Sequence, residues 1–195
     1  MRLRAAADPA GKDRLAAGSL DDHATDRADA VFARTVLLAE RRWNPSGDLD
    51  ELTAIHKGLF EGVFEDAGKL RTSNTTREVT NDRARAANPK AFFPAGLIET
   101  GAHNIAMELA DKRNLHALDR DVFVHAFASI YDELGYLHPF RGGNAMVLRI
   151  FGSRLAHDAG WDLDWGSVTR EEYRSAKHSA YRGDTSAPVS YTHLR

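Results

Sequence analysis

The stretch that decides the fold and the function reads His138-Pro139-Phe140-Arg141-Gly142-Gly143-Asn144-Ala145-Met146-Val147-Leu148-Arg149. Two glycines before a helical segment leave backbone N–H groups that can converge on an anion, and the helix N-terminus adds its dipole. His138, just upstream, can serve as a general base. Arg149, inside the helix, can bind phosphate groups. The stretch therefore indicates a loop that handles a nucleotide and carries its own base.

The chain on both sides of this stretch has the three- and four-residue apolar spacing of amphipathic helices. Such spacing runs from Val122 to Leu137 after a cap at Asp119, and again from Ala145 to His157. Further helices are expected, in chain order, over Val31–Leu38, over Leu49–Val63 with a stop at Ala67–Gly68, over Leu97–Leu109, and after the capping box Thr169-x-x-Glu172. The pattern predicts an all-α domain of about six to eight helices with one small β-hairpin.

The central stretch resembles the signature of the Fic family, His-x-Phe-x-(Asp/Glu)-Gly-Asn-(Gly)-Arg-x-x-Arg. It matches that signature at His138, Phe140, Gly143, Asn144 and Arg149. The resemblance runs from about Leu49 to Asp184: residues 52–71 look like the family's upstream helix and the turn after it, and Gly160–Trp165 and Tyr181–Asp184 look like its closing segments. It implies a Fic-type helical bundle.

The resemblance also implies an activity, that of a protein adenylyltransferase moving AMP from ATP to a target hydroxyl on Ser, Thr or Tyr. His138 would take the proton from that hydroxyl, and pyrophosphate would leave. Phe140 would anchor the loop, and the nucleotide would be bound by Gly142, Gly143, Asn144, Ala145 and Arg149.

The polar segment over residues 71–90 is expected to be functional, because long loops inside compact domains usually are. In the family that the chain resembles, this position is a β-hairpin flap over the active site. The resemblance implies that Ala91, Phe92 and Phe93 dock the target protein by adding a strand.

Two departures from the signature leave the activity open. The family has a metal-binding acid at the position of Gly142 and its first arginine at the position of Met146. Mg²⁺ is expected with ATP, although its usual acidic ligand is absent, and it could be held by the nucleotide and water alone. The donor could instead carry another phosphate-linked group. A third hypothesis is a pseudoenzyme that binds a nucleotide or a partner without turnover.

Composition narrows the class of protein. The 195 residues carry a formal net charge of −2 and no cysteine, which argues against a nucleic-acid binder, a membrane-surface binder and a zinc–thiolate site. No P-loop motif, metal-ligand pair, membrane-length apolar run or secretory signal is found. We therefore expect a cytoplasmic protein or, alternatively, an effector secreted into a host cell. No internal inhibitory motif is found, so a toxin held by a separate antitoxin is one hypothesis.

The expected domain organisation has three parts. Residues 1–30 are rich in Ala, Asp and Arg and are expected to form a mobile arm. Residues 31–187 form the Fic-type domain. Residues 188–195 resemble translated sequencing adapter and are expected to be a non-native tail.

Overall fold

A computed structural model of the protein describes residues 26–38, 46–76, 91–166, 169, 171–172, 175 and 193–194. Within them the longer helices are one over residues 26–38, α2 (Leu49–Phe60), α3 (Ile98–Asp111), α4 (Arg120–Leu137) and α5 (Asn144–Asp158), with short 3-10 turns at η1 (Ala95–Leu97) and η2 (Arg113–Leu115). The all-α prediction is confirmed. The described α-helices are fewer than the predicted six to eight, and most of the expected last helix lies outside the described residues.

Side-chain caps explain where the expected helices begin. Asp48 accepts a hydrogen bond from the Glu51 N–H at 3.0 Å at the start of α2, and Asp119 accepts one from the Val122 N–H at 3.0 Å at the start of α4. The capping box also forms. There the Glu172 N–H donates to the Thr169 hydroxyl over 3.2 Å, and the Thr169 N–H donates to the Glu172 carboxylate over 2.8 Å.

One helix boundary differs from the sequence pattern. The described part of the first helix, residues 26–38, includes the expected Val31–Leu38. Helix α2 ends at Phe60 and does not reach Ala67–Gly68, which corrects the expected stop. The physical reason lies just after Phe60: Glu61 has an extended ψ of 125°, and Gly62 has a φ of +76°, a left-handed conformation that ends a helix.

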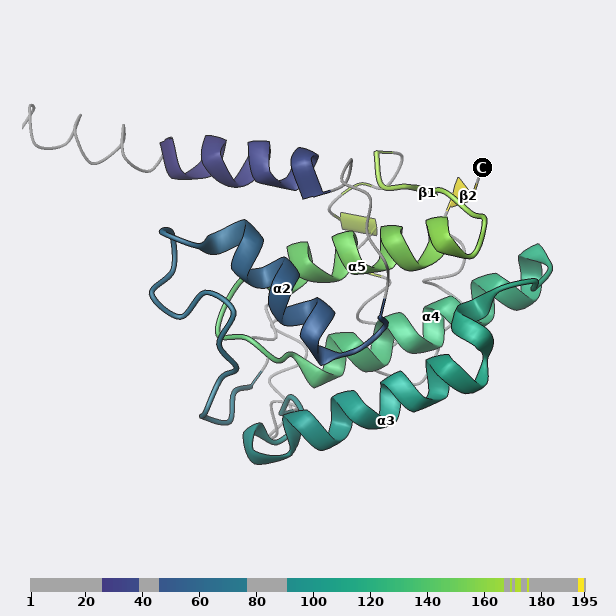
Figure 1. Ribbon diagram of the computed structural model, residues 1–195, viewed down its shortest axis with the longest axis horizontal. Helices are drawn as coiled ribbons and strands as arrows, with labels where there is room; N and C mark the ends of the chain where they lie inside the picture. The colour runs from purple at the N-terminus through teal and green to yellow at the C-terminus, as the bar shows by residue number, and fades with distance from the viewer. Residues whose placement is uncertain are drawn as a thin grey trace, which may run out of the picture.

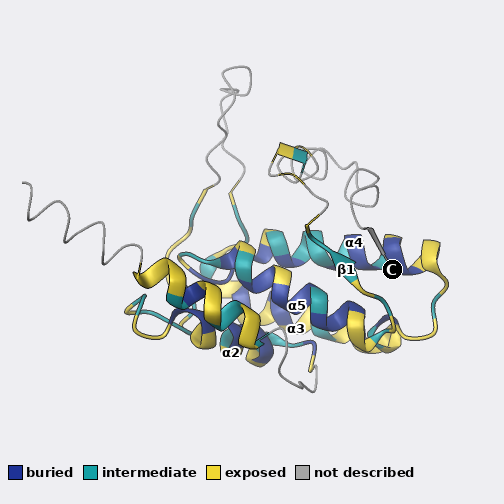
Figure 2. Ribbon diagram, turned by 90° about the horizontal axis from the view of Figure 1, so that it is seen from above, coloured by how far each residue is buried: buried dark blue, intermediate teal, exposed yellow. Residues whose placement is uncertain are grey.

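The core lies between α3, α4 and α5, which run side by side with α4 in the middle, while α2 packs against α5 and α3 (Figure 1). Buried residues gather on the facing sides of these helices (Figure 2). Burying a large apolar side chain contributes about 1.5–3 kcal/mol. The most deeply buried include Phe123, Phe140, Phe151, Ile55, Leu59 and Leu137. In the part of the chain that is described, no helix is both long and apolar enough to cross a membrane.

A buried ion pair joins α2 to α5. The Glu51 carboxylate lies 3.9 Å from the Arg154 guanidinium, and both side chains are almost fully buried. Glu51 also accepts a hydrogen bond from the Gly47 N–H at 3.0 Å, and Arg154 donates to the Leu38 carbonyl over 2.9 Å. These bonds attach Leu38 of the first helix and the turn before α2 to α5, the helix that carries Arg149.

Short β contacts complete the described fold. Strand β1 (Leu163–Asp164) pairs antiparallel with β2 (His193–Leu194), which belongs to the tail expected to be non-native. Thr76 forms an antiparallel bridge with Ala91, at the base of the expected flap. Several expected features lie outside the described residues: most of the arm, the flap residues 77–90, the family-like segment Tyr181–Asp184 and the rest of the tail.

Candidate active site

His138 is the C-cap of α4, and its strained backbone conformation sets the position from which its side chain extends. Its φ of 44° and ψ of 61° are left-handed, and its N–H still donates to the Leu134 carbonyl over 3.3 Å. The imidazole stacks on the ring of Phe92, with 3.7 Å between centroids and 14° between planes. A non-glycine residue keeps such a backbone only where its surroundings hold it. The structure thus brings the expected base and the expected flap together.

The Arg71 side chain lies next to the contact between His138 and Phe92, and Arg71 is only 3% exposed. Its Nε donates to the His138 carbonyl over 2.7 Å, and its Nη2 donates to the Leu137 carbonyl over 3.2 Å. The other guanidinium bonds go to the flap base, from Nη1 to the Ser73 carbonyl at 3.0 Å and from Nη2 to the Phe93 carbonyl. Burial lowers the pKa of Arg71 from its ordinary value.

The loop between the helices is held in shape by the Asn144 side chain. Its Oδ1 accepts from the Phe140 N–H at 3.0 Å, and its Nδ2 donates to the Phe140 carbonyl over 2.7 Å. Phe140 itself is fully buried. The structure thus uses the Asn144 amide to close the loop, and its predicted contact with phosphate stays a prediction.

The two glycines of the loop have different surroundings. Gly143 is the N-cap of α5 with a φ of +73°, and a Cβ there would lie 2.3 Å from the ring of Phe60. The backbone therefore requires glycine at this position. A Cβ at Gly142 would meet only the Phe64 ring, at an ordinary 3.5 Å. Position 142 can therefore accept a Cβ without a clash.

His56, in α2, contacts the loop between α4 and α5. Its ring stacks on Phe140 with 4.0 Å between centroids. Nδ1 accepts from the Gly68 N–H at 2.8 Å, so Nε2 carries the proton and donates to the Gly142 carbonyl at 3.2 Å. Burial lowers the pKa of His56, opposed by the Gly142 carbonyl and the charge of Asp66. The ring is therefore a neutral bridge between α2 and the loop.

The N-terminus of α5 has no side-chain cap among the described residues. The first N–H groups of a helix lack intrahelical partners and favour an anion. Ala145 and Arg149 are both exposed at this end of the helix. The Arg149 guanidinium carbon lies 5.9 Å from the centroid of the Trp165 ring, and the Trp165 indole N–H donates to Ser153 over 2.8 Å. The expected phosphate-binding groups thus share one helix end.

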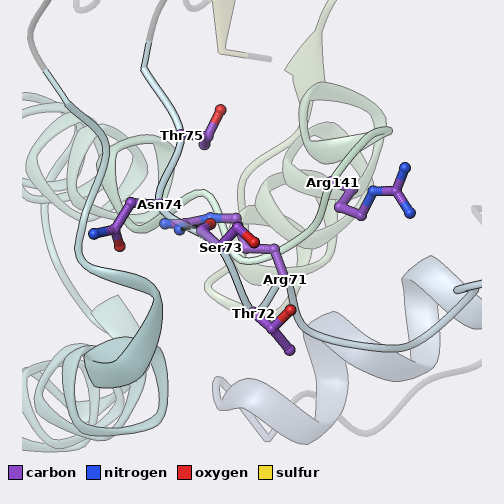
Figure 3. A pocket seen from close by; sticks show the side chains of 6 residues that line it. All are labelled: Arg71, Thr72, Ser73, Asn74, Thr75 and Arg141. Atoms are coloured by element: carbon purple, nitrogen blue, oxygen red, sulfur yellow. Dashed lines mark hydrogen bonds between the residues drawn. The ribbon is translucent and has the colours of Figure 1, made fainter.

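A pocket of about 270 Å³ lies beside the loop between α4 and α5. It is lined by Arg71, Thr72, Ser73, Asn74, Thr75 and Arg141. Figure 3 shows the lining residues of the segment that leads to the flap, with Arg141 coming from the loop after His138. Arg141 is highly exposed and lies 3.4 Å from the Asp66 carboxylate. The hydroxyl, amide and guanidinium lining suits a polar or anionic ligand.

The described residues do not fit a protein-held magnesium ion. They contain no group of three or more His, Cys, Asp or Glu side chains that could hold a metal. Gly142, at the position of the family's acid, offers only a backbone carbonyl, which His56 already binds. Met146 packs against the core. Within the described part of the chain, a metal that enters with a nucleotide would take its ligands from the nucleotide and water.

Sequence reasoning missed the part that His56 and Arg71 play in the site. Both lie in the family-like segment 52–71, and Arg71 opens the polar segment 71–90, but the sequence pattern assigns neither residue a contact in the site. The signal that can find His56 is a polar side chain on the apolar face of a predicted helix, and the signal that can find Arg71 is an arginine three residues after Gly68. Neither signal names the partner, which lies far away in the sequence.

Comparisons with known proteins show which proteins the chain is similar to. A model of the Fic/DOC family matches residues 46–156. Protein adenylyltransferase VbhT of Bartonella schoenbuchensis is 34% identical over 170 residues, covering 86% of this chain and 34% of that protein. A probable protein adenylyltransferase Fic of Salmonella typhimurium is 32% identical over 139 residues, covering 71% of this chain and 64% of that protein. The chain thus spans less than two thirds of either relative.

One solved structure extends the comparison to three dimensions. It is the N-terminal Fic domain of a VirB-translocated effector protein from Bartonella sp. AR 15-3, with a TM-score of 0.76 at 25% identity. The match covers 88% of this chain and 80% of that structure.

Proposed function

The chain belongs to the Fic/DOC family, and on that premise we propose that it is a protein adenylyltransferase, which moves AMP from ATP to the hydroxyl of a target protein. One observation carries the proposal. His138 and the uncapped N-terminus of α5 lie at the two ends of one short loop, and Asn144 and His56 hold that loop in shape. In this proposal, the arrangement puts the base and the anion site next to each other. The two adenylyltransferases that this chain is similar to support the donor.

The proposed step is an in-line displacement. The His138 imidazole takes the proton of the target hydroxyl, whose oxygen forms a bond to the α-phosphorus of ATP. The bond from that phosphorus to the bridging oxygen breaks, and pyrophosphate leaves. The N–H groups of Gly143 and Ala145 stabilise the negative charge that grows on the α-phosphate oxygens, because they are fixed before the reaction starts.

The other site residues serve binding in this proposal. Arg149 binds the distal phosphates, supported by the face of Trp165. Gly142 lets the nucleotide approach the backbone, and Phe140 anchors the loop. Ala91, Phe92 and Phe93 at the flap base receive an extended target segment, whose hydroxyl then meets the ring of His138 beside Phe92.

The test is label transfer from ATP labelled on its α-phosphate to protein in a bacterial lysate, with Mg²⁺ present. His138→Asn is the sharpest variant, because asparagine tolerates the left-handed backbone but cannot act as the base. We expect it to abolish transfer. The matched control is His103→Asn, an exposed histidine on α3. Transfer by folded His138→Asn at the wild-type rate would overturn the proposal.

A second candidate function is a non-catalytic nucleotide- or partner-binding module. The observation that favours it is the pair Gly142 and Met146, which removes an acid and an arginine relative to the family signature. It predicts that ATP binds to the wild-type chain without label transfer. Competition by cytidine or uridine nucleotides, with ATP ineffective, would instead identify another phosphate-linked donor.

The proposal includes a role as a toxin or a delivered effector, supported by the VirB-translocated domain among the solved structures. Expression of the wild-type chain in bacteria should then slow growth, whereas expression of His138→Asn should not. If a neighbouring gene product restores growth and binds the chain, it is the separate antitoxin. Equal growth of both strains, with label transfer intact, would leave the activity standing and reject the toxin role.

A further inference from the structure

We propose that Arg71 is a positioning residue that keeps the end of α4 and the flap base (residues 73–76 and 91–93) at fixed positions relative to each other. The His138 ring then meets the target beside Phe92. The inference rests on the proposed function, because it assigns His138 the part of the base. Its support is independent of the family signature, which begins at His138. It comes from the hydrogen bonds of a single buried guanidinium.

The first step concerns the end of α4. The last carbonyls of a helix have no intrahelical N–H partner, and a buried carbonyl without a donor is costly. Arg71 supplies donors to two of them, those of Leu137 and His138, at 3.2 and 2.7 Å. The backbone N–H of Arg71 also donates to the Pro139 carbonyl over 2.9 Å. Arg71 therefore binds three successive carbonyls around the left-handed turn that sets the origin of the His138 ring.

The second step concerns the flap base. The same guanidinium binds the carbonyls of Ser73 and Phe93, one on each side of the flap. Between them, the Phe92 N–H donates to the Thr75 carbonyl over 3.0 Å, and the Phe92 ring lies on the His138 ring. A shift of the flap base relative to α4 would therefore move the Phe92 ring across the imidazole. Arg71 opposes this shift, together with the Phe93 N–H, which donates to the Tyr136 carbonyl over 3.1 Å.

The third step is why the residue is arginine. A guanidinium presents five N–H donors in a fixed plane, whereas the lysine ammonium is a single point at the end of a flexible stem. Carbonyls on three separate segments can be reached at once only by the forked group. Its low exposure, 3%, keeps water from competing for these bonds. The geometry thus indicates that Arg71 holds these segments in place and is not a solvent-exposed charge.

The test compares Arg71→Met, Arg71→Lys and wild type by label transfer and by NMR of the His138 ring protons. The matched control is Arg34→Met. Arg34 also donates to carbonyls near a helix end, those of Leu59 and Glu61 at 3.1 and 2.7 Å, but in α2 and the turn after it. Circular dichroism and thermal melts identify which variants fold. Because ring stacking shifts proton resonances, the His138 signals report the Phe92 contact without any need for activity.

We expect Arg71→Met to lower kcat about 100-fold, as a displacement of about 1 Å can do, with the KM for ATP changed less than about threefold. Arg71→Lys should recover part of the rate, and Arg34→Met should keep the wild-type rate. The His138 ring signals should move in Arg71→Met and, by less, in Arg71→Lys, and should stay at their wild-type positions in Arg34→Met. If Arg71→Met does not fold, Arg71→Lys carries the comparison.

Two results would overturn the inference: wild-type kcat in a folded Arg71 variant, or a raised KM for ATP at constant kcat. If the wild-type chain itself transfers no label, the proposed function fails, and the NMR comparison still decides the inference. Unmoved His138 signals in Arg71→Met would then reject it. Moved signals would show that Arg71 positions His138 whatever the site is used for.

Discussion

The imidazole of His56 binds the carbonyl of Gly142, with Nε2 donating over 3.2 Å. The residues are 86 positions apart, one in α2 and one in the loop before α5. Because the other ring nitrogen accepts the Gly68 N–H, protonation of His56 would remove the Gly68 bond, whereas the bond to the Gly142 carbonyl would remain. Position 142, where the family signature has its acid, is therefore tied to α2 by a buried histidine.

The first prediction is a pH dependence of stability. Burial lowers the pKa of His56 in the folded state below its ordinary 6.5, so the unfolded chain binds the proton more readily. The stabilisation is fully present above about pH 6.5 and is lost as the pH falls below that value toward the lower folded pKa. The slope reaches at most about 1.4 kcal/mol per pH unit for one group. Urea unfolding between about pH 7.5 and 5.5 measures it.

The control for this prediction is a pair of variants. His56→Gln should lose stability at pH 7.5 and flatten the profile below it, because the titrating group is gone. His103→Gln, at an exposed position on α3, should keep the wild-type profile. A wild-type slope in His56→Gln would assign the dependence to other groups.

The second prediction concerns Gly143. Gly143→Ala places a Cβ 2.3 Å from the Phe60 ring and forces a non-glycine residue to a φ of +73°. We expect a loss of about 2–4 kcal/mol, the sum of the conformational cost and the overpacking cost. Gly62→Ala separates the two, because Gly62 has a φ of +76° with no atom within 4 Å of its Cβ position. A similar loss in both variants would show that the contact with Phe60 costs nothing.

The third prediction concerns the missing acid and arginine. A Cβ at position 142 makes only ordinary contact with Phe64, so Gly142→Glu should fold with a melting temperature close to wild type. In the double variant with Met146→Arg, we expect label transfer from ATP to rise about tenfold or more, because charge stabilisation returns to the phosphate site. A folded double variant with unchanged transfer would show that neither departure limits the activity.

The fourth prediction concerns the support of Arg149. Trp165→Leu removes the aromatic face below the guanidinium, and we expect ATP to bind about two- to fivefold more weakly, in line with an exposed cation–π contact. Ser153→Ala removes only the partner of the indole N–H and should have a smaller effect. Isothermal titration with ATP gives both affinities. Equal binding by Trp165→Leu and wild type would mean that Arg149 needs no support from Trp165.

Local sequence signals predicted much of the helical framework. Asp48, Asp119 and the Thr169–Glu172 box cap helices because capping involves residues only a few positions apart. The predicted end of α2 was wrong, because the apolar spacing continues to Val63 while the backbone turns at Glu61 and Gly62. Periodicity records which residues face the core, and not whether the backbone that carries them is still helical.

The sequence by itself determined the order of the helices, the loop between His138 and Arg149, and the need for glycine near the start of α5. These depend on short-range spacing and on the backbone freedom of single residues. Only the tertiary structure decided that Arg71 binds the end of α4 and the flap base, that His56 binds Gly142, and that Phe92 lies on His138. Such contacts join residues that are distant in sequence, and their partners are set by how the helices pack, which no local pattern encodes.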